Sequence, residues 1–80
     1  MRLDKFLKVS LLIKRRTIAK EACEASKVIV NGKVARASYE VKIGDTIEIN
    51  MGAKNTKIRV LDVKEYCKKE DVLNLYEVLN

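Results

Sequence analysis

Residues 14–32 constrain the fold more than any other stretch of the chain. Three cations open this stretch, an amphipathic segment follows, and a β-branched run at residues 28–30 leads into Asn31-Gly32. Asn-Gly between two apolar runs is the strongest short-range signal for a β-hairpin, because both residues tolerate positive φ. The stretch therefore predicts a helix, a strand and a tight turn in immediate succession.

The amphipathic segment predicts a helix that begins near Thr17. The Thr17 hydroxyl can accept a hydrogen bond from the free amides of a first turn, which is the role of an N-cap. The helix is expected to end near Ser26 or Lys27, although no glycine is present for the left-handed position that usually closes a helix. A buried stripe at helical spacing is expected to consist of Ile18, Ala19, Ala22, Cys23 and Ala25.

Cations stand at the unfavourable end of this helix. Lys14, Arg15 and Arg16 precede it, and Lys20 lies in its first turn. The helix macrodipole is positive there, so each exposed cation costs about 0.3–1 kcal/mol. Free amides and the dipole both favour an anion at that end, so the arrangement predicts a docking site for an anion. A solvated basic loop is the alternative interpretation.

A first helix is expected over residues 2–13, before the central stretch. Arg2, Lys5 and Lys8 lie three residues apart, so they share one face, while apolar residues at helical spacing form another. The residues expected to face the core are Leu3, Phe6, Leu7 and Leu11.

Short strands and turns are expected after the hairpin. Gly44-Asp45 and residues 51–55 read as turns. The apolar phase slips at Leu61 and Val63, which predicts a β-bulge. The expected strands cover residues 33–35, 40–41, 46–50 and 56–63.

A last helix is expected over residues 69–79, where Glu70 and Asp71 suit the N-terminal dipole. The layout predicts an α+β fold and a single domain spanning residues 1–80. Two N-terminal helices would pack on a small, mostly antiparallel, twisted sheet, followed by a C-terminal helix. The apolar residues of that last helix would be Val72, Leu75, Tyr76 and Leu79.

Length and composition exclude several classes of protein. Eighty residues leave no room for a catalytic domain beside a binding domain, and no apolar run of about 18 residues predicts a membrane span. The chain does not begin with a charged and then apolar leader, so we expect no signal peptide. Cys23 and Cys67 are distant from each other, which favours reduced thiols in a cytoplasmic protein over a disulfide. Histidine is absent, so we expect no zinc site. No constellation of catalytic residues stands out, so we expect no cofactor and no enzymatic activity.

Charge is distributed unevenly along the chain. The net charge is +6, and residues 1–36 carry +7 of it while residues 37–80 carry −1. Such asymmetry indicates a nucleic acid or an anionic membrane as partner. The first helix offers only Val9 and Leu12 for insertion into a membrane, so we favour nucleic acid.

Few aromatic residues are available to stack on bases, so a folded RNA read by shape and backbone is expected. Thr17, Asn31 and Ser38 could add neutral hydrogen bonds to phosphate or ribose. The candidate RNA-binding residues are Arg2, Lys5, Lys8, Lys14, Arg15, Arg16, Thr17, Lys20, Lys27, Asn31, Lys33 and Arg36.

Four groups of residues resemble the RNA-binding domain named after ribosomal protein S-four. Within that superfamily the chain is most similar to the RqcP family, the short stand-alone members of bacterial ribosome-associated quality control, and the resemblance covers nearly all 80 residues. Ser26-Lys27 departs from the family, which usually has a glycine in that turn. The matching groups are Arg2-Leu3-Asp4-Lys5-Phe6-Leu7, Arg16-Thr17 with Ala19, Val28-x-Val30-Asn31-Gly32 and Val41-x-x-Gly44-Asp45-x-Ile47.

The resemblance implies a function on the ribosome. It implies binding to rRNA of a large subunit that still holds peptidyl-tRNA, and support for the elongation factor RqcH as it adds a C-terminal alanine tail. The expected state is a cytoplasmic monomer. The alternative is the heat-shock-type ribosome-recycling relative, which usually carries a longer basic C-terminal extension. Carried over by position, the RNA contacts would be Arg2, Lys5, Arg15, Arg16, Thr17 and Lys20.

Overall fold

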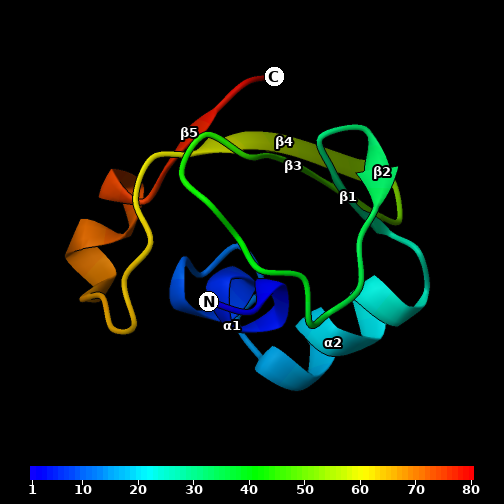
Figure 1. Ribbon diagram of the computed structural model, residues 1–80, viewed down its shortest axis with the longest axis horizontal. Coiled ribbons are helices and arrows are strands. Elements are labelled where there is room, and N and C mark those ends of the chain that lie inside the picture. The colour runs from blue at the N-terminus through cyan, green and yellow to red at the C-terminus, as the bar shows by residue number, and fades with distance from the viewer.

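The computed structural model describes all 80 residues and has two layers (Figure 1). Helices α1 and α2 cover one face of a five-stranded antiparallel sheet with strand order β2-β1-β3-β4-β5. The expected α+β fold is therefore confirmed, and the sheet is antiparallel throughout. In chain order the elements are α1 (Leu3–Val9), α2 (Arg16–Glu24), β1 (Val28–Val30), β2 (Lys33–Val34), β3 (Thr46–Met51), β4 (Lys54–Val60), the 3-10 helix η1 (Lys69–Asn74) and β5 (Tyr76–Val78).

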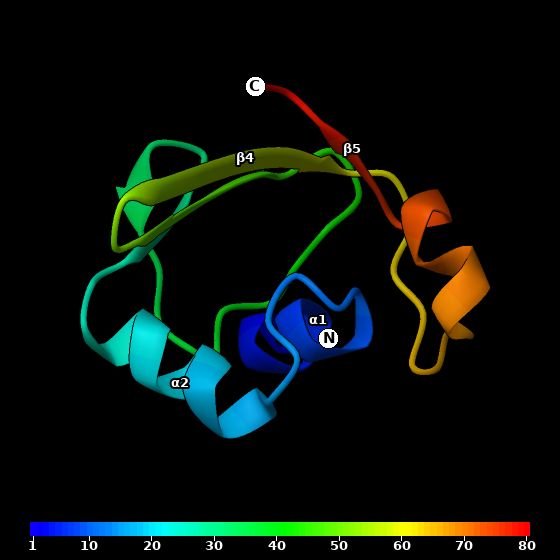
Figure 2. The same ribbon diagram turned by 180° about the vertical axis from the view of Figure 1, so that it is seen from behind.

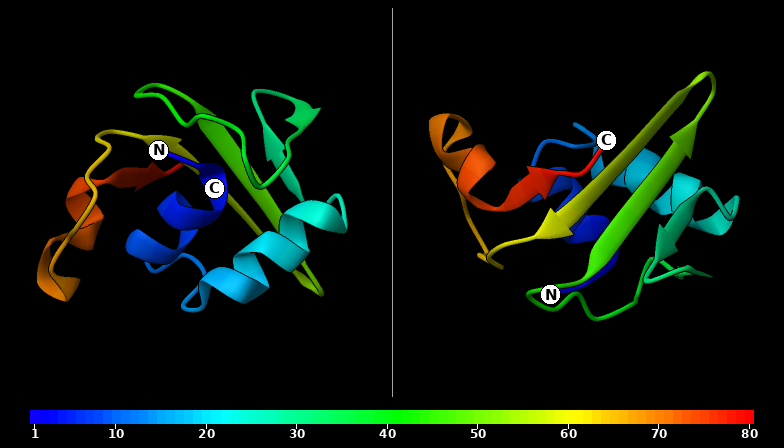
Figure 3. Two further views of the ribbon diagram at one scale, coloured as in Figure 1. Left: turned by 60° about the horizontal axis from the view of Figure 1, so that its bottom comes forward. Right: turned by 90° about the horizontal axis from the view of Figure 1, so that it is seen from above.

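Helix α1 lies between α2 on one side and the C-terminal segment on the other, as the view from behind also shows (Figure 2). The long β3–β4 hairpin belongs to the sheet, and no helix covers the face of the sheet that points away from α1 and α2 (Figure 3). The helices, of seven and nine residues, fall short of the length that would cross a membrane.

The core fills the space between α1, α2 and the sheet. Strand register places the apolar residues in rows, with Val30 opposite Ile47 and Ile47 opposite Ile58. Small residues on α2 allow that helix to approach the sheet closely. The residues buried between the layers include Leu3, Phe6 and Leu7 of α1, Ala19, Ala22 and Cys23 of α2, and Val28, Val30, Ile47, Ile49, Ile58 and Val60 of the sheet.

Helix α1 is shorter than expected, and the assignment of Leu11 to the core is wrong. The helix ends at Val9, Ser10 donates its hydroxyl to the Leu7 carbonyl, and Leu11 adopts a left-handed φ of 60°. That turn directs Leu11 to the surface, with an exposed fraction of 36%, and Ile13 is buried instead. Helical spacing does not apply beyond the residue at which the helix stops.

The N-terminus of α2 also differs from the expectation. The helix begins at Arg16, with Arg15 extended before it and no side-chain cap, so the prediction of Thr17 as N-cap is wrong. The hydroxyl of Thr17 lies inside the first turn, where it cannot take the N-cap position. Ile18 and Ala25 are exposed, so they do not extend the buried stripe.

Helix α2 ends at Glu24, earlier than the expected end near Ser26 or Lys27, and a residue that is not glycine takes the left-handed position. Ser26 has φ of 61°, and the amides of Ser26 and Lys27 donate to the Cys23 and Ala22 carbonyls at 3.1 and 3.0 Å. This pair of bonds is a Schellman motif, which satisfies carbonyls left free by the end of the helix at Glu24. A non-glycine residue in this conformation costs about 1 kcal/mol.

The expected hairpin is present, and one buried carboxylate fixes the loop that follows it. Asn31 and Gly32 have positive φ and connect β1 to β2. Asp45 accepts hydrogen bonds from the Asn31 amide at 3.0 Å, the Tyr39 hydroxyl at 2.8 Å and the Lys42 backbone N–H at 2.9 Å. These bonds hold the loop of residues 35–45 against the Asp45 carboxylate.

The loop after β2 contains less extended structure than expected, and the turn of the β3–β4 hairpin is shorter than expected. The predicted strand at residues 40–41 is reduced to a single bridge between Glu40 and Arg2. The turn predicted at residues 51–55 consists of Gly52 and Ala53, because the strands remain paired up to it.

The C-terminal region departs most from the sequence-based expectation. Strand β4 ends at Val60, so the apolar phase slips because the strand stops, and the predicted bulge is wrong. The helix expected over residues 69–79 covers only Lys69–Asn74 and is of 3-10 type. Strand β5 replaces the rest, because its backbone groups pair with the edge of β4, with Val60 opposite Tyr76.

Candidate nucleic-acid interface

A buried carboxylate organises the cations at the start of the chain. Asp4 has an exposed fraction of 3% and lies in the first turn of α1. Arg2 donates to it from Nε at 3.1 Å and from a terminal nitrogen at 3.3 Å, and Arg16 of α2 donates from a terminal nitrogen at 3.4 Å. We call Arg2, Asp4 and Arg16 the arginine cluster.

The two arginines of the cluster favour the charged form of Asp4. Burial alone would raise the pKa of Asp4, but hydrogen bonds from Arg2 and Arg16 and the charges of both arginines hold that pKa below its usual value. One carboxylate cannot neutralise two guanidinium groups, and both arginine side chains remain about half exposed. The cluster therefore presents oriented guanidinium groups with donors left for an outside anion.

The loop after β2 closes onto the N-terminus and adds further groups. The amides of Leu3 and Asp4 donate to the Tyr39 and Ala37 carbonyls at 2.8 and 3.2 Å, and the Val41 amide donates to the Met1 carbonyl at 2.9 Å. These bonds satisfy free amides of α1 and hold the loop beside Arg2.

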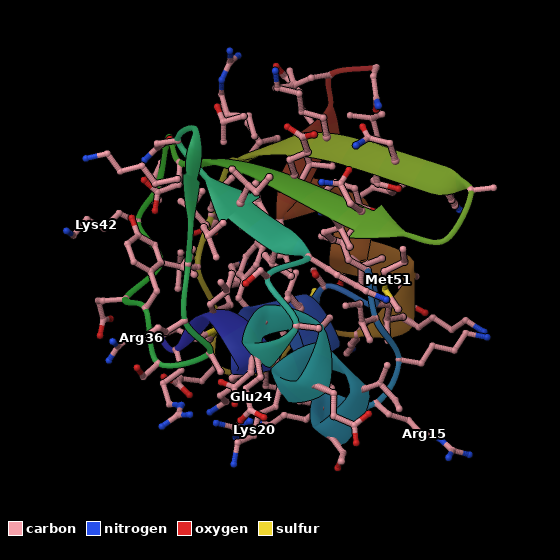
Figure 4. The ribbon with its side chains drawn as sticks, turned by 90° about the vertical axis from the view of Figure 1, so that its right-hand side faces the viewer. Arg15, Lys20, Glu24, Arg36, Lys42 and Met51 are labelled. Atoms are coloured by element: carbon pink, nitrogen blue, oxygen red, sulfur yellow. The ribbon has the colours of Figure 1, made fainter.

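Two adjoining hollows, which we call the cationic groove, lie between this loop, α2 and the β1–β2 hairpin. Their volumes are about 540 and 590 Å³, and Arg36 and Ser38 line both. Arg2 and Lys20 line the first hollow, and Lys33 lines the second. Figure 4 shows Lys20 and Arg36 on one side of α2, with Glu24 next to Lys20.

The cationic groove keeps most of its positive charge. Arg36 and Lys33 form no ion pair in the chain, and Lys20 reaches Glu24 only at 4.0 Å on the surface, where such a pair contributes little. Cys23 also lines the groove, but burial, with the negative charges of Asp4 and Glu24, raises the pKa of its thiol to about 11. The thiol is therefore neutral near pH 7 and adds no reactive group.

The structure thus brings together six of the candidate residues expected from the sequence. Asn31 differs from the other five, because its amide already bonds within the chain, to Asp45 and to the Thr46 N–H. The six are Arg2, Arg16, Lys20, Asn31, Lys33 and Arg36.

The other candidates lie elsewhere. Lys5 pairs with Glu65 of the C-terminal segment, and Lys8 lines a separate hollow there. Lys27 and Met51 line another hollow. Figure 4 shows Met51 and Arg15 on the side of α2 that is away from Lys20 and Arg36. Lys14 and Thr17 are exposed and make no ion pair or side-chain hydrogen bond.

Sequence reasoning missed the role of Asp4. The available signal was a single acid between Arg2 and Lys5 in an otherwise cationic opening. Its burial was not evident, because charged residues are almost never fully buried unless they are paired, and the pairing partner Arg16 comes from another helix.

Asp4 predicts an acid sensitivity that can be measured. Folding lowers the pKa of Asp4, so its ionised form stabilises the fold fully above the usual value of 3.8, and this contribution is lost as the pH falls through the folded pKa. We expect Asp4→Asn to lower the free energy of unfolding by about 1–3 kcal/mol at pH 7, because Arg2 and Arg16 would then face a neutral amide and lose their hydrogen bonds to a charged carboxylate. Urea unfolding at pH 7 and near pH 3 should show the difference from wild type shrinking at the lower pH. The control is Asp71→Asn, because Asp71 is exposed and has no ion pair; a difference independent of pH would contradict the role of Asp4.

The model of the S4 domain matches residues 1–47, which include the arginine cluster and the cationic groove. The RQC P-site tRNA stabilizing factor of Halalkalibacterium halodurans is 55% identical over 78 residues, covering 98% of this chain and 89% of that protein. The chain belongs to this family. The stabilizing factor of Bacillus subtilis is 48% identical over 79 residues, covering 99% of this chain and 92% of its own. The resemblance to stand-alone S-four-type proteins of ribosome-associated quality control is therefore confirmed.

Two solved structures have the same fold as this chain. Trimeric heat shock protein 15 of Vibrio cholerae superposes with a TM-score of 0.92 at 29% identity, covering 99% of this chain and 81% of that one. The solution structure of the hypothetical protein HP1423 gives a TM-score of 0.85 at 33% identity, covering 100% and 98%. The S4 match ends inside β3, so the segment that follows β4 lies outside it.

Proposed function

We propose that this protein binds structured RNA on large ribosomal subunits that still carry peptidyl-tRNA, and that it acts there in ribosome-associated quality control. The arginine cluster carries this proposal, because it holds two guanidinium groups in fixed orientation at the edge of the cationic groove. Guanidinium forks match the two oxygens of a phosphate. The names of the relatives, which contain both RQC and P-site tRNA, support the same target.

The finer part of the proposal concerns the partner and the outcome. The protein would support alanine tailing of stalled nascent chains by RqcH, acting as a cytoplasmic monomer that binds and does not catalyse. Similarity to relatives named for stabilising a P-site tRNA supports a binding role.

A heat-shock-type ribosome-recycling factor is the second candidate. It is favoured by the structural likeness to heat shock protein 15 and by 32% identity to the heat shock protein 15 homolog of Aeromonas salmonicida. This chain spans 57% of that homolog and about nine tenths of the stabilizing factors, which supports the first proposal.

The test is recovery of the tagged protein from cells with stalled ribosomes. We expect isolated large subunits with peptidyl-tRNA to copurify, together with RqcH and alanine-tailed chains. Recovery of large subunits without RqcH or tailed chains would favour the heat-shock-type function. Recovery on liposomes but not on ribosomal RNA would overturn both.

Salt dependence gives a physical test of the interface. We expect about five to eight phosphate contacts, so the logarithm of affinity should fall with the logarithm of salt concentration at a slope of about −0.9 per contact for a duplex, and less for unpaired RNA. Filter binding to ribosomal RNA over a series of salt concentrations measures this slope. A slope near zero would contradict a phosphate-driven interface.

A further inference from the structure

Tyr66 is the one strongly exposed aromatic residue of the chain. Its exposed fraction is 77%, while Phe6 is fully buried and Tyr39 and Tyr76 are partly buried against the core. Tyr66 lies in the segment between β4 and η1, outside the region that matches the S4 domain. A tyrosine side chain with this exposure contributes little to the packing of the core.

A hollow of about 270 Å³ opens beside the Tyr66 ring, where this segment meets the C-terminal end of α1. Val9, Leu11 and Cys67 form its apolar part, and Val9 and Cys67 also pack against the core. Tyr66 therefore stands at the side of a concave apolar surface that is backed by the fold. Figure 3 shows the segment next to α1, on the side away from α2.

The edge of this hollow is positively charged. Lys8 and Lys69 line it, and neither forms an ion pair in the chain. Glu65 also lines it, but Lys5 binds that carboxylate, and the hydrogen bond and charge of Lys5 lower the pKa of Glu65. The Lys5–Glu65 pair occupies this carboxylate and leaves Lys8 and Lys69 unpaired.

An exposed aromatic face, a small apolar hollow and unpaired lysines together match one unpaired nucleotide. The base can stack on the tyrosine ring, because every base has a π-face, and the ammonium groups can hold the adjacent phosphates. Lys8 is the last cation of the row along α1 that starts at Arg2, about 9 Å away along the axis by the rise of a helix. One RNA could therefore contact both the arginine cluster and this hollow.

We propose that Tyr66, with Lys8 and Lys69, binds a single unpaired base of the RNA and forms a second contact site beside the one in the S4 domain. This site rests on the proposed RNA-binding function. It adds a stacking contact to an interface that otherwise reads phosphate and shape.

The test compares two RNA stem-loops, one with a single unpaired adenosine in its stem and one with the stem fully paired. We expect Tyr66→Ala to weaken binding of the first by about 5- to 150-fold, which corresponds to 1–3 kcal/mol per stacked base, and to leave the second within about twofold. Tyr66→Phe should retain the affinity, because it keeps the ring. Lys69→Ala should weaken both RNAs and reduce the salt slope by about one contact.

Matched controls keep the outcomes distinct. Leu73→Ala removes another strongly exposed apolar side chain and should change neither affinity, and circular dichroism should show all variants folded. Equal binding of the unpaired-base RNA by wild type and Tyr66→Ala would overturn the inference, as would loss of affinity with Tyr66→Phe. Binding unaffected by Tyr66→Ala, with Tyr66 crosslinking to a ribosomal protein on large subunits, would assign the hollow to a protein partner and overturn it too. If neither Tyr66→Ala nor Arg16→Ala changes the affinity for either RNA, the proposed function fails. If Arg16→Ala weakens binding and Tyr66→Ala does not, only the second site fails.

Discussion

Leu75→Ala is expected to lower the free energy of unfolding by about 2–5 kcal/mol, the range for truncating a buried leucine. Leu75 has an exposed fraction of 1% and is the one buried residue of the segment that follows β4. Its backbone carbonyl also accepts from the Leu61 and Asp62 amides at 2.8 and 3.3 Å, so the backbone and the buried side chain of Leu75 both hold this segment against the end of β4. A domain of this size has a stability of only about 5–15 kcal/mol, so part of the population should unfold at physiological temperature.

Urea unfolding followed by circular dichroism measures this effect. Leu73→Ala is the matched control, because the same side chain is removed at a position with an exposed fraction of 69%, and it should change stability by less than about 0.5 kcal/mol. Leu79→Ala should also have a small effect, since that residue is exposed. If Leu75→Ala keeps its melting temperature but loses binding to ribosomal subunits, Leu75 belongs to an interface and its assignment to the core is wrong.

Arg16→Ala is expected to weaken binding to isolated large ribosomal subunits by about 1.5–3 kcal/mol, the range for a hydrogen bond to a charged group. Arg16 is the first residue of α2, beside backbone amides that no side chain caps, and its guanidinium is oriented by Asp4. Stability should change by less than about 1 kcal/mol, because Arg2 still neutralises Asp4 and a cation is removed from the positive end of the helix.

Two variants show whether this effect is local. Arg16→Lys should recover only part of the lost affinity, because an ammonium group cannot donate to two phosphate oxygens in the fixed geometry of a guanidinium. Lys57→Ala removes the same charge from an exposed position on strand β4 and should have little effect. If Lys57→Ala weakens subunit binding as much as Arg16→Ala, the RNA responds to overall charge and the arginine cluster is not a specific site.

The sequence itself determined the features that arise from local chemistry. Asn31-Gly32 specified the hairpin, because positive φ at both positions is an intrinsic preference of those residues. The periodic apolar residues of α1 and β3 specified their buried faces. The cation-rich first half of the chain indicated an anionic partner, because net charge can be counted without knowing the fold.

Only the tertiary structure decided the features that depend on distant neighbours. Residues 76–78 carry a helical period, yet they form β5 because β4 offers unpaired backbone groups at its edge. Asp4 reads as an ordinary surface acid until α2 places Arg16 against it. The candidate cations form one continuous set in the sequence, whereas the fold places Arg2, Lys20 and Arg36 in one groove and Lys8 in another hollow beside Tyr66. The physical reason is that sheet-edge pairing, burial of a charge and the sharing of a surface are properties of pairs of segments, and no local pattern specifies which segments will meet.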